Sequence, residues 1–348
     1  MADFELMPSS ELWATNPAAG GVSGLRPRKE APVRAGKIEK ENLRHHKNKT
    51  DAAADAAADA ITKAVQLLLW DNLPVWAREG NHYIETGYRP VNVPIKDCLH
   101  SMTYLHNETI NIFSHLIGAL LFFALPVYVF STEIPPRYAV ATTTDKVVSC
   151  AYFLGVAFCF VFSTIFHMFL NHSAEIFSLG LKLDFQGVIL LMWGANIPVI
   201  YYGFVCEPQL QFIYWSLITA LAFSCSVFTF QPQFSNPHLR PLRAATFGSL
   251  AMSTFIPVFH GIYKYGYRLQ SRRISLFWIM MTLLFNTVGA GAYAFKFPER
   301  WYPRRFDIFG ASHQIMHIAI LIAGFMFAFA VIDEFDYMHA HPTQCASQ

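Results

Sequence analysis

Runs of about 20 apolar residues recur along the chain from residue 111 onward, and short polar segments separate them. Each run is long enough to cross roughly 30 Å of hydrocarbon at 1.5 Å per residue of helix. The pattern predicts seven membrane-spanning helices, at residues 111–130, 147–169, 178–203, 210–230, 244–263, 274–295 and 312–332. The predicted fold class is therefore an all-α membrane protein, a bundle of seven transmembrane helices.

The residues before the first run follow other patterns. Residues 1–50 are rich in Pro, Gly, Ala and charge, too polar to bury a core, which predicts disorder. The repeat DAAADAAADA at 51–60 predicts an Ala-rich helix with one acidic stripe. The segment ITKAVQLLLWDNLPVW at 61–76 is broken by Pro74 and too short to span, so we expect it at the membrane interface.

Composition supports a membrane protein over two soluble domains, because 53% of residues are hydrophobic and 14% are charged. Of the 26 Lys and Arg residues, 13 precede residue 111, whereas the loops between spans divide theirs evenly between the two sides. The basic N-terminal arm and the acidic tail DEFDYM favour a cytosolic N-terminus and an outside C-terminus, opposite to G-protein-coupled receptors. We then expect a cytosolic N-terminal region over 1–104, a transmembrane domain over 105–335 and an extracytosolic tail over 336–348.

This orientation also places the sequons at Asn48, Asn107 and Asn171 in the cytosol, where they go unglycosylated. The six cysteines have no C-x-x-C spacing, and several lie in apolar runs, where they behave as small hydrophobic residues. We therefore expect neither a disulfide framework nor a cysteine metal site.

Five histidines lie in or at the ends of the predicted spans, where an unpartnered polar side chain is costly: His115, His167, His260, His313 and His317. His115 starts the first span and His260 ends the fifth, so both are expected to reach interfacial water. His313 and His317 are four residues apart, which puts both imidazoles on one helix face at a metal-binding spacing. The alternative is that both hydrogen-bond to neighbouring helices.

Four side chains are predicted at similar depth. The second span ends, and the third and seventh begin, on the same side of the membrane, which brings His167, Asp184, His313 and His317 near one face. Three imidazoles with an open fourth position are typical of catalytic zinc sites, and a nearby carboxylate can orient a ligand. Asp184 has a second interpretation, since an acid in the first turns of a helix is stabilised by the helix dipole.

These motifs resemble the progestin and adipoQ receptor family, which includes adiponectin receptors, fungal homologues and haemolysin-III-like proteins. The resemblance covers residues 70 to 332 and rests on WAREGNHYIETGYRP, HNETINIFSHLIGALLFF, S-x-x-x-H at Ser163 to His167, Asp184, and H-x-x-x-H at His313 to His317. The spacer and short loops look most like a fungal member. The resemblance implies zinc held by the three histidines near the cytosolic face, with Asp184 and Ser163 beside it. It further implies ceramide amide hydrolysis for adiponectin receptors, and roles in zinc and lipid homeostasis for fungal members.

The expected function is thus a zinc-dependent lipid amide hydrolase of the ceramidase type, in a receptor of the plasma membrane or an endomembrane. Asp184 would act as base or orient the water, and Ser163 would hydrogen-bond beside the metal or stabilise an oxyanion. The expected partners are a membrane lipid, namely ceramide, a sphingoid base or a free fatty acid, and an extracellular protein ligand, but no nucleic acid.

Three other functions are alternatives to this one. A receptor that only signals would use zinc as a structural staple. A retinal protein is disfavoured because the seventh span lacks a lysine for the Schiff base. A G-protein-coupled receptor is disfavoured by orientation and by the missing D-R-Y and N-P-x-x-Y motifs.

Overall fold

The computed structural model describes residues 67–78, 81–131, 137–231, 237–342 and 345. The chain divides after Ile61 into two units, Met1–Ile61 and Thr62–Gln348, and every described residue belongs to the second unit. The expected disordered arm, the Ala-rich helix and the start of the interfacial segment lie outside the described residues.

Within the described part of the chain, seven helices are long and apolar enough to cross a membrane, which confirms the predicted fold class. They are α3 (Thr109–Ser131), α5 (Thr143–Phe169), α6 (Ala174–Gly203), α7 (Pro208–Thr229), the pair α8 (Arg240–Ser253) and α9 (Phe255–Tyr265), α11 (Leu276–Phe295) and α12 (Ser312–Ala340). Short helices precede or join them: η1 (Trp70–Asn72), η2 (Val75–Ala77), α2 (Ile95–His100), η3 (Ser101–Thr103), α4 (Arg137–Val140), η4 (Pro237–Leu239) and α10 (Tyr267–Arg273).

Five spans lie within four residues of the predicted boundaries at each end, and the other two differ in a further way. The fifth is interrupted at Thr254, between α8 and α9. Pro257 explains the break, because a proline lacks the N–H that would bond the carbonyl of Ser253 in a regular helix. The seventh continues to Ala340, beyond the predicted end at 332, because the polar residues that follow extend the helix past the apolar run.

Local signals start the helices where the sequence changes from polar to apolar. The Thr142 side chain and Asp145 form a capping box at the start of α5. Ser173 accepts a hydrogen bond from the Ile176 N–H at the start of α6, and α7 begins with Pro208 in its first turn.

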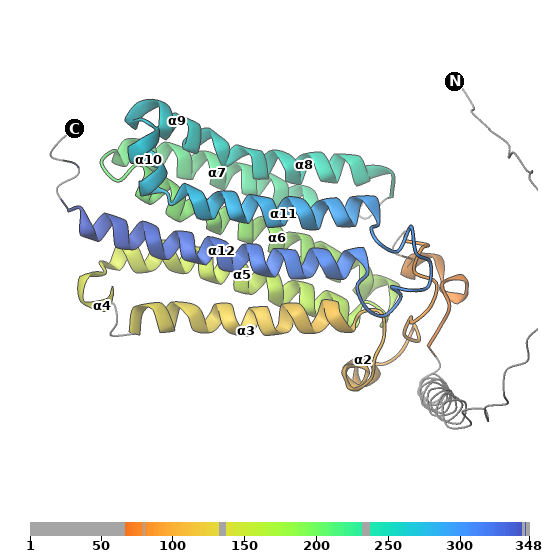
Figure 1. Cartoon of the computed structure of the whole chain (residues 1–348). Coiled ribbons are helices and arrows are strands. Elements are labelled where there is room, and N and C mark those ends of the chain that lie inside the picture. Colours follow the sequence, from red (N-terminus) through yellow and green to blue (C-terminus); the bar gives the residue numbers. More distant parts are fainter. Residues whose placement is uncertain (1–66, 79–80, 132–136, 232–236, 343–344, 346–348) are drawn as a thin grey trace, which may run out of the picture. The chain divides into compact units, whose positions relative to one another are not determined.

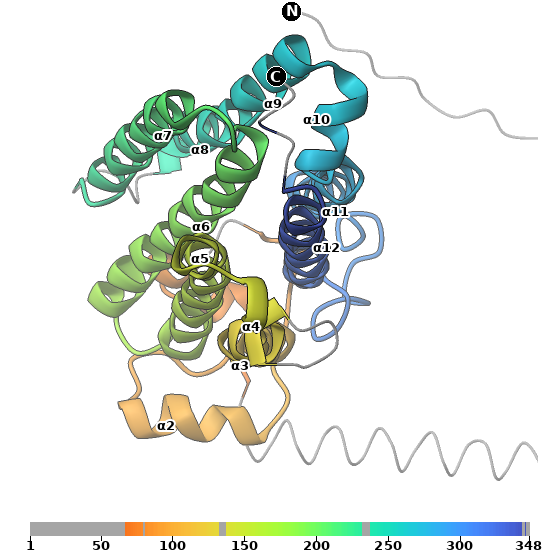
Figure 2. The same ribbon diagram turned by 90° about the vertical axis from the view of Figure 1, so that its left-hand side faces the viewer.

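The spans pack around α5 and α12. Helix α5 packs against α3 and α6, α11 packs against α12, and α7 packs against the outer side of α6 (Figures 1 and 2). The main core includes Phe122, Phe153, Phe160 and Phe327 from α3, α5 and α12. Glycines let α5 and α6 approach closely: a Cβ on Gly194 would lie 2.5 Å from the Ala151 carbonyl oxygen. The α5 and α6 backbones therefore touch, which fixes the separation of residues carried on the two helices.

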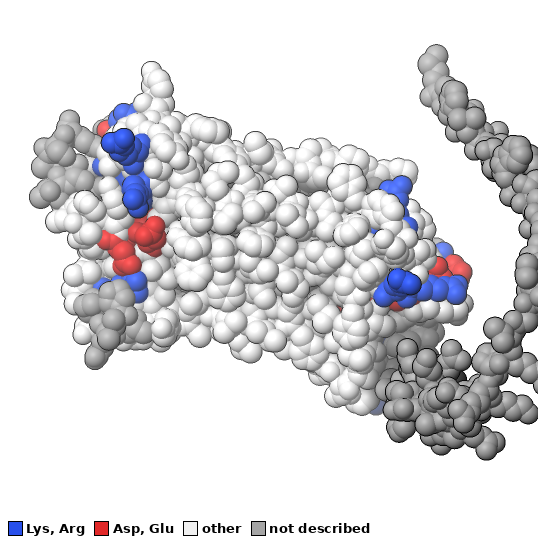
Figure 3. Space-filling view, viewed as in Figure 1, with Lys and Arg blue, Asp and Glu red and all other residues white. Residues whose placement is uncertain are grey.

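Charged side chains gather at the two ends of the bundle. On the face shown in Figure 3, the band between these ends carries no Lys, Arg, Asp or Glu. Many large apolar side chains on the spans are exposed, among them Phe212, Phe223 and Phe277. This distribution is that of an integral multi-pass membrane protein.

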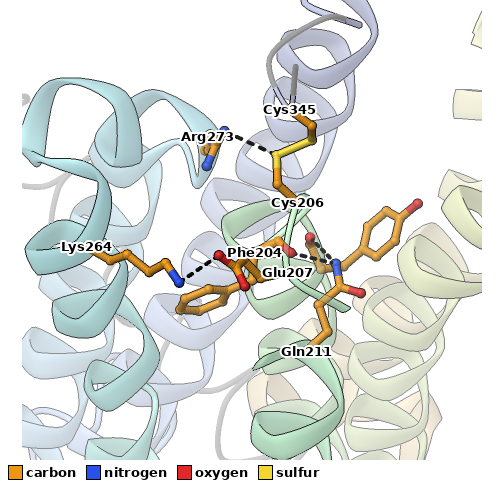
Figure 4. The surroundings of a disulfide bond; sticks show 8 residues. Phe204, Cys206, Glu207, Gln211, Lys264, Arg273 and Cys345 are labelled. Atoms are coloured by element: carbon orange, nitrogen blue, oxygen red, sulfur yellow. Dashed lines mark hydrogen bonds and ion pairs between the residues drawn. A yellow bond between two sulfur atoms is a disulfide. The ribbon is translucent and has the colours of Figure 1, made fainter. Parts of the chain in front are cut away.

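A disulfide joins Cys206, after α6, to Cys345, after α12 (Figure 4). The expectation that the cysteines form no disulfide is therefore wrong. Both cysteines follow spans that end on the same side of the bundle, so the fold brings the two thiols to the same end. Nearby, Lys264 pairs with Glu207, and Arg273 Nη2 lies 3.7 Å from Cys206 Sγ (Figure 4).

Candidate metal centre

Three histidines from two helices meet at the end of the bundle opposite the disulfide. The candidate ligand nitrogens of His167, His313 and His317 all lie within 4.8 Å of one another. His167 ends α5, whereas His313 and His317 occupy the first two turns of α12. His167 and His317 are buried and His313 is partly buried. The structure thus brings together all three predicted ligands.

The chemistry of this cluster suits a divalent transition metal. Neutral imidazole nitrogens are common zinc ligands, and three of them leave one tetrahedral position open. Nδ1 of His317 is buried and makes no hydrogen bond to any described residue, as expected for a nitrogen that can bind a metal. The three residues therefore fit a zinc ion.

Glu108, which the sequence reasoning missed, holds His167 in place. Its Oε2 lies 2.8 Å from His167 Nδ1 and accepts a 2.6 Å hydrogen bond from Asn111 Nδ2. An ionised carboxylate at Nδ1 keeps the proton on that nitrogen, so the lone pair of Nε2 is left for a metal. Glu108 is therefore a positioning residue for one candidate ligand.

Hydrogen-bond donors around Glu108 keep its carboxylate ionised. Burial alone would raise the pKa of Glu108, but His167 beside it and the Asn111 amide hold that pKa below its ordinary range. Burial, assisted by Arg89, lowers the pKa of His106 to about 3. Neutral His106 accepts the Glu108 N–H at Nδ1, 3.1 Å away, and so fixes the turn that carries the carboxylate.

The end of α5 is clamped by Arg89. Its guanidinium donates to the backbone carbonyls of His167 at 2.6 Å and Met168 at 3.0 Å, and to Ser101 Oγ at 2.8 Å. A cation at a helix C-terminus satisfies carbonyls that lack an intrahelical partner. The Arg89 side chain is 3% exposed, so the clamp is part of the core.

The start of α12 is fixed by two buried polar side chains. Glu299 accepts hydrogen bonds from the Ser312 N–H at 2.8 Å and from the Ser312 hydroxyl. Gln314 accepts from the Gly310 N–H and donates to the carbonyls of Asn107 and Ile308. The turn that presents His313 is therefore tied to the turn that precedes α3.

Ser163 and Asp184 lie next to the cluster and contact each other. The Ser163 hydroxyl lies beside the Asp184 carboxylate, and this carboxylate also lies near His167. Ser163 is buried and Asp184 is half-buried. The structure thus places both predicted non-histidine residues beside the histidines.

His115 also lies at the cluster, so the expectation that it reaches interfacial water is wrong. Its ring stacks on His317 with centroids 3.9 Å apart and an angle of 18° between planes, and the residue is 3% exposed. His260 lies far along α9 and contacts the Tyr214 hydroxyl at 2.7 Å. The sequence carries a partial signal, because Asn111 and His115 are four residues apart in α3 and share a face, and Glu108 lies just before this helix.

A polar pocket of about 40 Å³ opens beside His313. Its lining includes Glu108, Asn111, Tyr293 and Lys296. The volume suffices for water molecules but not for an acyl chain.

A bundle of seven membrane helices with a buried three-histidine centre at one end defines a class of polytopic membrane proteins. Within that class, the chain belongs to the haemolysin-III-related family, whose pattern it matches over residues 103–328, more than half of its length. Its relatives include the progestin and adipoQ receptor-like protein 1 of Caenorhabditis elegans and two fungal proteins named as ADIPOR-like receptors, in agreement with the predicted resemblance.

The chain is 37% identical over 278 residues to the adiponectin receptor protein of Drosophila melanogaster, with 79% of this chain and 62% of that protein covered. It is 32% identical over 291 residues to the ADIPOR-like receptor IZH2 of Saccharomyces cerevisiae, covering 84% and 91%. It is 31% identical over 263 residues to heptahelical transmembrane protein 1 of Arabidopsis thaliana, covering 75% and 78%. The chain thus spans less than two thirds of the Drosophila relative.

Proposed function

We propose that the protein is a zinc-dependent hydrolase of ceramide-like lipid amides. The observation that carries the proposal is the convergence of His167, His313 and His317 beside a Ser163–Asp184 pair. Three nitrogen ligands with a separate carboxylate are the composition of catalytic zinc sites, which keep one coordination position for water or substrate. A lipid that enters from the bilayer would meet the site with its amide near headgroup depth.

Each residue of the site has a part in this reaction. When bound, zinc polarises a carbonyl oxygen and makes water a strong nucleophile at neutral pH. Asp184 accepts a proton from the attacking water and returns it to the leaving nitrogen. Ser163 lies beside Asp184 and would orient its carboxylate through the hydroxyl. The water oxygen bonds to the carbonyl carbon and the C–N bond breaks, which yields a free fatty acid and an amine.

A second candidate is a receptor in which zinc is structural. The relatives in Drosophila and yeast carry the word receptor in their names, and carboxylates lie near the histidines. A fourth protein ligand would close the site and leave no position for substrate.

Purified full-length protein should contain zinc and release fatty acid from ceramide. His313→Ala should lose most of the zinc and all hydrolysis together, because three ligands are needed for a stable site. His260→Ala removes a histidine outside the cluster and should keep both. Zinc content is measured by elemental analysis, and hydrolysis by chromatography of the released acid.

Asp184→Asn distinguishes the two candidates. If Asp184 is the base, this variant keeps its zinc but loses about 100-fold or more in turnover. Zinc-loaded wild-type protein that releases no fatty acid would instead support the receptor with structural zinc.

A further inference from the structure

The two sulfur atoms of the Cys206–Cys345 disulfide have different surroundings. Cys345 is exposed, whereas Cys206 is half-buried in the turn between α6 and α7. Access is one of the factors that decide which sulfur of a disulfide an external thiol attacks. An incoming thiol therefore reaches Cys345 more easily than Cys206.

A buried cation lies against the less accessible sulfur. Nη2 of Arg273, at the end of α10, lies 3.7 Å from Cys206 Sγ and points toward it (Figure 4). The Arg273 side chain is 1% exposed, and its guanidinium carbon lies 4.8 Å from the centre of the Tyr265 ring. A guanidinium stays charged at every physiological pH, and a positive charge beside a sulfur favours the thiolate. Arg273 is therefore placed to stabilise negative charge on Cys206.

The acid next to Cys206 in the sequence has its own partner. A carboxylate at Glu207 would oppose a second negative charge on the neighbouring sulfur. Nζ of Lys264 lies 2.6 Å from this carboxylate and balances its charge (Figure 4). The contact of Arg273 with Cys206 is thus separate from the ion pair beside it.

The turn that carries Cys206 is fixed by hydrogen bonds as well as by the disulfide. Gln211 donates from Nε2 to the carbonyl oxygens of Tyr201 at 2.9 Å and Phe204 at 3.1 Å (Figure 4). These bonds join the end of α6 to the first turn of α7. Cys206 therefore stays near Arg273 when the bond to Cys345 breaks.

We propose that this disulfide is a site of thiol exchange, at which a small thiol such as glutathione becomes attached to Cys345. The incoming thiolate attacks Cys345 Sγ and forms a new S–S bond there. The Cys206–Cys345 bond breaks, and its electron pair leaves on Cys206 as a thiolate beside Arg273. One thiolate is consumed and one is formed, so the step needs no proton. A second thiol that attacks the mixed disulfide leaves with the first as their own disulfide, and Cys345 is then reduced.

Exchange would free the C-terminal tail but leave α12 in place. Two other contacts hold the same end of α12. Arg137 on α4 pairs with Asp336 at 2.7 Å, and His339 lies 3.1 Å from Asp145 on α5. The fold and the zinc content should therefore survive exchange. The reaction occurs at the end of the bundle opposite the metal centre and is measured without any hydrolase activity, so this proposal stands or fails separately from the proposed function.

The first test locates the adduct. Purified, folded full-length protein is incubated with glutathione at mildly alkaline pH, quenched with acid at early times, alkylated and digested. Mass spectrometry of the peptides should find most of the glutathione on Cys345 and the alkylating group on Cys206. An adduct mainly on Cys206, or none on either cysteine, would overturn the proposal.

The second test measures the role of the cation. Reduction of the disulfide by dithiothreitol should be slower in Arg273→Gln by about 3-fold or more, because a leaving thiolate without its cation leaves more slowly. Arg273→Lys keeps the charge and should react at a rate closer to that of the wild type. Arg268→Gln is the control, since Arg268 is an exposed residue of the same helix.

Retained zinc shows that each variant is folded. Equal rates for the wild type and a folded Arg273→Gln would overturn the role of Arg273. If Arg273→Gln does not fold, the position of the adduct in the wild-type protein decides the proposal.

Discussion

The carboxylate of Glu108 determines which nitrogen of His167 faces the other two histidines. Replacing it with the neutral amide in Glu108→Gln removes the charge-assisted contact at Nδ1. Loss of such an outer contact typically weakens metal binding by about 10-fold to 100-fold. Zinc affinity is measured by competition with a fluorescent chelator.

The matched control is Glu85→Gln, which removes a carboxylate that pairs with Arg304 at the surface. Its zinc affinity should equal that of the wild-type protein. Equal affinities for Glu108→Gln and the wild type would exclude the positioning role.

At the scale of residues, the three histidines could be predicted from two features of the sequence. One is helix geometry, and the other is whether an even or odd number of membrane crossings precedes each helix end. The spacing of His313 and His317 sets a shared face, and counting crossings sets the end of the bundle. Glu108 and His115 were harder to find, because neither lies in a repeat of the histidine motif. Their contacts depend on how α3 packs against α5 and α12, which no local pattern encodes.

Among the elements, the segment before α3 is held to the end of α5 through Arg89. Arg89→Met should destabilise the fold by about 2–3 kcal/mol, because buried acceptors lose hydrogen bonds from a charged donor. It should also loosen His167 and lower zinc retention. Thermal unfolding and zinc content measure the two effects.

Arg78→Met is the control, since Arg78 is exposed and bonds only to nearby carbonyls of its own segment among the described contacts. A melting temperature for Arg89→Met that matches this control would show that the clamp contributes nothing.

The close contact of α5 with α6 depends on glycine. In Gly194→Ala the new methyl would meet the Ala151 carbonyl oxygen at 2.5 Å, so the helices must separate. Such overpacking costs about 1–3 kcal/mol and would move Asp184 away from His167. Gly248→Ala offers a control, because a Cβ there meets no atom within 4 Å. We expect a lower melting temperature for the first variant only, and equal values would contradict the packing argument.

At this scale, hydropathy was sufficient for the number and order of the spans, because each must cover the same thickness of hydrocarbon. Hydropathy was insufficient to predict the residues at which the helices are interrupted or end. The break at Thr254 is caused by a proline within an apolar run. Helix α12 extends beyond the apolar residues because Asp336 forms an ion pair with Arg137 on α4. Such partners are brought together only by the fold.

For the whole molecule, the two ends of the bundle carry different chemistry. One end holds the histidine cluster with the sequons Asn107 and Asn171, which are 8% and 3% exposed. The other holds the disulfide and the acidic end of α12. Disulfides persist in oxidising compartments, so this arrangement supports the proposal that the C-terminal end faces outside or an organelle lumen. The metal centre would then face the cytosol, as the basic N-terminal arm predicts.

The disulfide could have been anticipated from the order of the spans. Cys206 follows the third span and Cys345 follows the seventh. Because an odd number of spans precedes each cysteine, the two thiols emerge on the same side of the membrane. The absence of a C-x-x-C motif argues only against local pairs. Pairing across 139 residues depends on the fold that brings the two ends together.

A glycosylation tag tests this orientation, whichever membrane the protein occupies. An Asn-x-Thr acceptor peptide fused after Gln348 should be glycosylated, because oligosaccharide transfer occurs in the lumen of the secretory pathway. The native sequons at the other end should stay unmodified. In the same sample, after denaturation without reduction, the disulfide should prevent Cys206 and Cys345 from reacting with a maleimide. In Cys206→Ser the disulfide is lost, so Cys345 should react. An unglycosylated tag together with two reactive thiols would place the C-terminal end in the cytosol, and with it the metal centre on the opposite side.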